Sequence, residues 1–159
     1  MRAGVYETPR DDRNLVHSLE HGYVIISYNC DKKISNFKLN NLPLAGQISN
    51  VYAHGTEEEE EASPSSTEAT EAGQLSAAFR SDECHDLVDQ LIGVYEKKGK
   101  RKLIVVPRPN LDSRIALTAW NYLDKFDPST GSGLSVSEME RIERFIDTYR
   151  DMGPERTME

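Results

Sequence analysis

A run of five glutamates near the middle of the chain limits which residues can contribute to a folded core. Residues 57–61 are all glutamate, and the surrounding stretch of residues 54–75 is rich in glutamate, alanine, serine and threonine. Such a stretch offers little apolar surface to bury and repels itself, so we predict that it is a disordered insertion. The chain of 159 residues is expected to form one domain that carries this insertion.

The net charge of −8 comes almost entirely from the insertion. Residues 57–61 together with Glu68 and Glu71 carry seven of the negative charges, and the rest of the chain is nearly neutral. That remainder has no positive field of the kind that holds a phosphate backbone, so nucleic acid is not an expected partner.

Membrane-spanning and signal segments are absent from the sequence pattern. No stretch approaches the roughly 20 apolar residues that cross a bilayer. Residues 1–9 are followed directly by polar sequence, without the apolar core of a signal peptide. A membrane is therefore a partner only through a segment that this sequence does not contain.

Three short apolar segments predict β-strands. Residues 23–28 are β-branched and aromatic and are bounded by Gly22 and Asn29, which is typical of a central strand. Residues 103–106 and residues 115–120 show the same apolar character. These segments predict one small sheet.

Two further segments predict helices. Leu87 and Leu91 belong to an apolar series at helical spacing that begins after Ser81. Ser135 and Glu138 fit a capping box at the start of a second helix. The order of strands and helices predicts an α+β fold, in which a small mixed or antiparallel sheet carries two main helices packed on one face.

His17, Glu20 and His21 form an H-x-x-E-H string, the spacing found in inverzincin metalloproteases. On a helix, the two histidines share one face and could hold a divalent transition metal such as zinc or copper. In a hydrolase, Glu20 would then be the general base. If residues 16–28 instead form one strand, the imidazoles lie about 13 Å apart and cannot share an ion. A third interpretation is structural, with these side chains hydrogen-bonded at the entrance to a strand.

Other side chains are candidates for supporting roles. Tyr23 and Arg108 are candidates for supporting the polar site, and arginine suits recognition of a carboxylate or phosphate. Cys30 and Cys84 could form one disulfide in an oxidising compartment, or remain two thiols in a reducing one.

Several segments together resemble a known protein family. Residues 15–28, from Leu15 through the histidine string to Tyr28, are similar to the hallmark segment of the bacterial domain of unknown function 3105 (DUF3105). The segments 107–109, 117–120, 126–127 and 145–155 resemble later segments of the same family. The resemblance covers nearly all of the chain except the acidic insertion.

The resemblance implies a location rather than an activity, because the family carries no established activity. Its members commonly have an N-terminal membrane anchor with the domain on the outer side, and a Pro-Thr-Ser-Gly-Pro-His-like segment that would supply a third histidine. We therefore expect an extracytoplasmic domain whose N-terminus is truncated relative to the family. The main hypothesis is a polar, metal-binding site at His17, Glu20 and His21; the alternatives are a purely structural or interaction module and a zinc-dependent hydrolase.

Overall fold

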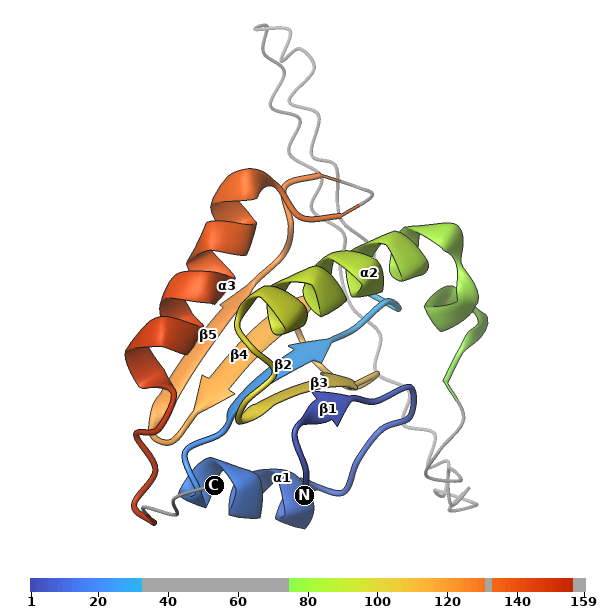
Figure 1. The fold of residues 1–159 in the computed structure, drawn as a ribbon. Helices are drawn as coiled ribbons and strands as arrows, with labels where there is room; N and C mark the ends of the chain where they lie inside the picture. Colours follow the sequence, from blue (N-terminus) through green and yellow to red (C-terminus); the bar gives the residue numbers. More distant parts are fainter. Residues whose placement is uncertain (33–74, 131–132, 156–159) are drawn as a thin grey trace, which may run out of the picture. The chain divides into compact units, whose positions relative to one another are not determined.

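The computed structural model describes residues 1–32, 75–130 and 133–155 (Figure 1). The predicted acidic insertion at residues 54–75 lies almost wholly outside these ranges, so its predicted disorder stays a prediction. Within the described ranges, no helix combines the length and the apolar character needed to cross a membrane.

Five strands form one mixed sheet in the order β1-β3-β2-β4-β5. The strands are β1 (Gly4–Val5), β2 (Val24–Tyr28), β3 (Leu103–Pro107), β4 (Ile115–Ala119) and β5 (Tyr122–Phe126). β1 and β2 run parallel to β3, whereas β4 runs antiparallel to both β2 and β5. The α+β prediction is confirmed, and the sheet is mixed rather than purely antiparallel.

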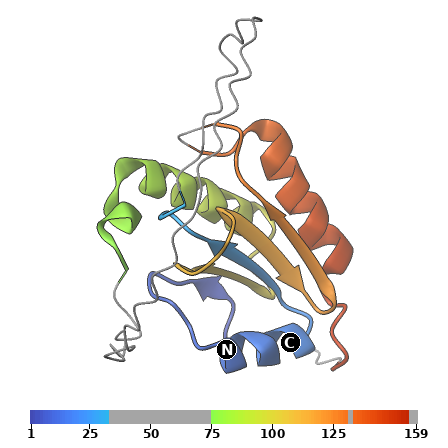
Figure 2. The same ribbon diagram turned by 180° about the vertical axis from the view of Figure 1, so that it is seen from behind.

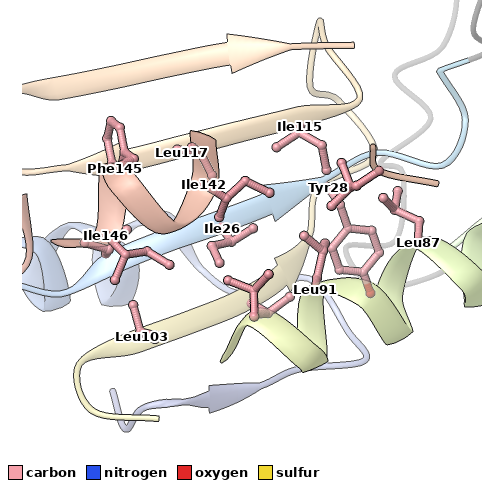
Figure 3. Packing of buried hydrophobic residues seen from close by; sticks show 14 of the residues in the cluster. Ile26, Tyr28, Leu87, Leu91, Leu103, Ile115, Leu117, Ile142, Phe145 and Ile146 are labelled. Carbon is pink, nitrogen blue, oxygen red and sulfur yellow. The ribbon is translucent and has the colours of Figure 1, made fainter. Parts of the chain in front are cut away.

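Two helices, α2 (Asp82–Lys97) and α3 (Val136–Tyr149), cover one face of the sheet (Figure 1). A short 3-10 helix, η1 (Ala77–Arg80), precedes α2. Ser81 caps α2, and Ser135 and Glu138 form the predicted capping box of α3. Figure 3 shows that this side of the core interleaves side chains of both helices with those of the strands, and it labels Ile26, Tyr28, Leu87, Leu91, Leu103, Ile115, Leu117, Ile142, Phe145 and Ile146.

The opposite face of the sheet carries α1 (Asp12–Glu20), which lies away from α2 and α3 (Figure 2). Leu15 packs there in a second buried cluster with Tyr23, Ile25, Ile104 and Val106. β2 and β3 are thus buried on both faces, which is why their sequences are apolar without alternation.

Besides the short 3-10 helix η1, three elements were not assigned from the sequence, each for a physical reason. β1 is only two residues long. α1 buries Leu15 and Ser18 only, so its apolar stripe is too short to be recognised by periodicity. β5 is one of the two edge strands of the sheet, and most of its residues are exposed. It contains Asp124 beside Lys125, a composition that protects sheet edges but does not resemble a buried strand.

Candidate functional site

α1 places the two histidines of the H-x-x-E-H string one helical turn apart. The helix begins after Asp11, whose side chain accepts a hydrogen bond from the Arg13 backbone N–H. It ends at His21, where the following Gly22 adopts a left-handed backbone (φ +80°) typical of a helix C-terminus. The alternative in which residues 16–28 form one continuous strand is therefore wrong.

The two imidazoles face each other across a short gap. Nε2 of His17 lies 3.1 Å from Nε2 of His21, and the rings meet edge to face with their centroids 4.5 Å apart. The side chain of His17 is 59% exposed and that of His21 is 22% exposed. The pair is therefore accessible from solvent through His17, whereas the side chain of His21 is mostly covered by the protein.

A carboxylate lies beside the opposite nitrogen of each ring. Oε2 of Glu20 is 3.3 Å from Nδ1 of His17, and Oε2 of Glu155 is 3.4 Å from Nδ1 of His21. A carboxylate at Nδ1 favours the tautomer with its proton on that nitrogen. In that state both Nε2 atoms are acceptors, whereas a proton on either Nε2 makes the 3.1 Å contact a hydrogen bond between the two rings.

The C-terminal segment brings Glu155 to the site through backbone contacts with the end of α1. The N–H of Asp151 donates to the carbonyl of Gly22 (2.9 Å), and the N–H of Glu155 donates to the carbonyl of Glu20 (3.0 Å). Gly153 packs so closely that a Cβ at this position would overlap the carbonyl oxygen of Glu20. We call residues 151–155 the C-terminal strap.

Two basic residues before β3 hold the strap. The ammonium group of Lys102, whose side chain is 5% exposed, donates to the carbonyl of His21 (2.9 Å) and lies 3.2 Å from Oδ1 of Asp151. Arg101 makes two further hydrogen bonds to the Asp151 carboxylate. Burial tends to raise the pKa of Asp151, but hydrogen bonds from Arg101 and Lys102 and their charges outweigh it, so this pKa lies below its ordinary value.

The strap should therefore weaken in acid. A carboxyl whose pKa is lowered by folding stabilises the native state above its unfolded-state pKa of about 3.9, and this contribution is lost as the pH falls through the folded-state pKa. Asp151→Asn removes the charge and keeps a side chain that tolerates the left-handed backbone here (φ +70°). In urea denaturation, we expect the stability difference between wild type and variant to be largest at neutral pH and to shrink below about pH 4. A difference that stays constant with pH would contradict this account.

The remaining candidates lie elsewhere or have other surroundings. Tyr23 is buried in the core cluster beneath α1. Arg108 pairs with Asp12 (2.7 Å), at the opposite end of α1 from His21, so the structure does not bring it to the histidines. Glu20 contacts Nδ1 of His17, the ring nitrogen turned away from the gap, and this position suits orienting the ring better than taking a proton from a bound water.

Cys30 and Cys84 form a disulfide that joins the segment after β2 to the first turn of α2. Their Cα atoms are 5.7 Å apart, and both side chains are buried. Neither cysteine lies among the histidines, so a mixed cysteine and histidine metal site is not formed by these residues.

Three residues that contact the candidate site were not found from the sequence: Glu155, Gly153 and Lys102. All of them contact the end of α1 from distant parts of the chain. The only local sequence feature at these positions was Gly153 followed by Pro154, and this pair indicates the end of a helix without indicating a contact with α1. The long-range pairing itself has no sequence signature.

Among the described residues, no group of three or more histidine, cysteine, aspartate or glutamate side chains is arranged to hold a metal ion. In this part of the chain, the H-x-x-E-H string brings together two imidazoles without a third ligand side chain. The sequence model of a family described as "Protein of unknown function (DUF3105)" matches residues 1–67 and 40–159. No curated protein and no solved structure gives a significant match.

Proposed function

The chain belongs to the DUF3105 family, and we propose that this domain binds a divalent transition metal ion, zinc or copper, through Nε2 of His17 and Nε2 of His21. The observation that carries the proposal is the 3.1 Å separation of these two nitrogens. Two imidazoles on a tetrahedral zinc, each about 2.0–2.1 Å from the ion, hold their nitrogens roughly 3.3 Å apart.

The surroundings of the pair support the same proposal. Protein imidazoles that bind metal commonly donate their second N–H to a carboxylate, which sets the tautomer and the ring orientation. Glu20 and Glu155 occupy that position for His17 and His21 respectively. With two protein ligands from the described residues, the other positions on the ion would be filled by water or by groups outside these residues.

We also propose that the domain works outside the cytosol, as the family resemblance implies. Support comes from the Cys30–Cys84 disulfide, because disulfides persist in oxidising compartments and are rare in the cytosol. A membrane anchor upstream of the domain would hold it at the outer surface. Alkylation of cysteines in the native protein, followed by mass spectrometry with and without a reductant, tests the disulfide in cells.

Metal binding is tested by titrating the metal-free protein with Zn²⁺ and with Cu²⁺ in separate calorimetric experiments. Wild type should bind one ion per chain, and His17→Ala/His21→Ala should abolish this binding. Glu155→Gln, which removes only the carboxylate beside His21, should weaken binding about 10- to 100-fold. Copper should bind more tightly than zinc, as expected for nitrogen ligands.

The matched control is His85→Ala, which removes an exposed histidine on α2 and leaves the pair intact. It should bind the metals like wild type. Equal binding by wild type and by the double variant would contradict the proposal, as would the absence of stoichiometric binding. If the double variant instead loses stability without any loss of metal, the histidines are structural.

A further inference from the structure

A groove with a volume of about 350 Å³ lies beside α1. It lies on the α1 face of the sheet, away from the histidine pair. One wall is the apolar side of α1, and the floor and second wall come from β2, β4 and β5. The residues lining this α1 groove are Asp12, Leu15, Val16, Leu19, Ile25, Ser27, Arg108, Leu111, Ala116, Thr118, Leu123 and Lys125.

Small side chains on the sheet create the hollow. Strand pairing sets Ser27, Ala116 and Lys125 in one row across β2, β4 and β5. The next row on the same face contains Ile25, Thr118 and Leu123. On the opposite face the same strands present large apolar side chains that α2 and α3 cover, so only the α1 face is left open beyond β2.

The open end of the groove lies on β5, one of the two edge strands of the sheet. β5 pairs with β4 on one side, and among the described residues no strand pairs with its other side. Leu123 is 60% exposed there, and Val16 is exposed on the facing wall. Two of the other residues of β5 contact α3: Tyr122 stacks on Tyr149, and Asp124 accepts two hydrogen bonds from Arg141.

The groove is lined by more cations than anions. Two cations, Arg108 and Lys125, line it beside one anion, Asp12. Both cations are paired, Arg108 with Asp12 and Lys125 with Asp112, but the two aspartates are largely exposed. Exposed ion pairs of this kind are weak, so an incoming carboxylate can replace either aspartate.

We propose that β5 and the α1 groove bind an extended peptide segment of another protein, in which an apolar and an acidic residue are two positions apart. Such a segment adds a strand to the free edge of β5, with main-chain hydrogen bonds for affinity and alternate side chains for specificity. Leu123 and Lys125 are two positions apart on one face, so the added strand sets an apolar side chain beside Leu123 and a carboxylate beside Lys125.

The test is fluorescence anisotropy with a fluorescein-labelled peptide of sequence Thr-Leu-Thr-Glu-Thr-Leu-Thr, which contains the spacing in both chain directions. A second peptide has lysine in place of glutamate. Binding is measured with EDTA present, so the result is independent of the metal proposal. We expect the acidic peptide to bind at least about tenfold more tightly than the basic one.

Two variants identify the surface. Leu123→Ser should weaken binding of the acidic peptide about fivefold. Lys125→Glu should make the domain bind the basic peptide more tightly than the acidic one. Val136→Ser is the matched control, since Val136 is 68% exposed on α3 and does not line the groove. It should bind like wild type, and thermal melts of all three variants verify that they are folded.

Three outcomes would overturn the proposal. The first is no binding of either peptide up to millimolar concentration. The second is equal binding of both peptides by wild type and by Lys125→Glu. The third is self-association of the domain that Leu123→Ser abolishes, because this result would assign the edge of β5 to a second copy of the chain.

Discussion

Replacing Cys30 and Cys84 together with alanine is expected to lower the free energy of unfolding by about 4 kcal/mol. The disulfide joins residues 54 positions apart, and closing a loop of that length removes much of the conformational freedom of the unfolded chain. Both cysteines are buried, so the variant also loses packing around the end of β2 and the start of α2. Urea denaturation of the oxidised wild type and of the variant measures the difference.

A reducing agent supplies the control for the disulfide. Dithiothreitol should destabilise wild type by an amount similar to the double substitution and should leave the variant unchanged. Equal stability of wild type and variant under oxidising conditions would show that the Cys30–Cys84 bond contributes nothing to the fold.

Gly153→Ala is expected to cost about 1–3 kcal/mol, a magnitude typical of overpacking a tight contact. The added Cβ overlaps the carbonyl oxygen of Glu20 and the backbone nitrogen of Gly22, and backbone atoms cannot turn aside as a flexible side chain would, so the strap has to move. Displacement of the strap carries Glu155 away from His21. We therefore expect weaker binding of Zn²⁺ together with lower stability, measured by calorimetry and urea denaturation on the same preparation.

Gly93→Ala is the matched control for this substitution. Gly93 lies inside α2, and a Cβ there meets no other atom within 4 Å. Alanine is favoured over glycine in a helix interior, so this variant should be more stable by about 0.5–1 kcal/mol. If both glycine variants behave alike, the contact between Gly153 and Glu20 does not constrain the strap.

Local sequence patterns were sufficient to predict a helix or strand where that element is long or deeply buried. The apolar segments at residues 23–28 and 103–106 predict strands, because burial on both faces leaves no room for polar side chains. The capping box of Ser135 and Glu138 marks the start of α3, since both hydrogen bonds form between near neighbours in the chain. These features depend on local sequence alone.

Local sequence patterns could not decide whether the H-x-x-E-H string is helical or extended. His17 and His21 lie in a nine-residue helix with only two buried residues, so neither helical nor strand periodicity was decisive. The helix is held by its cap at Asp11 and by packing of Leu15 on the sheet. Tertiary contacts therefore determined whether the two imidazoles could meet.

By itself, the sequence determined the α+β class, the central strands, the two main helices and the residues from which a metal site could be built, because these follow from local burial and capping. Only the tertiary structure decided that the imidazoles of His17 and His21 lie in contact and that the carboxylate of Glu155 lies beside His21. The strap reaches the end of α1 through backbone contacts that require glycine at Gly153 and a buried charge at Lys102. Such contacts join residues more than 80 positions apart, and no local pattern encodes them.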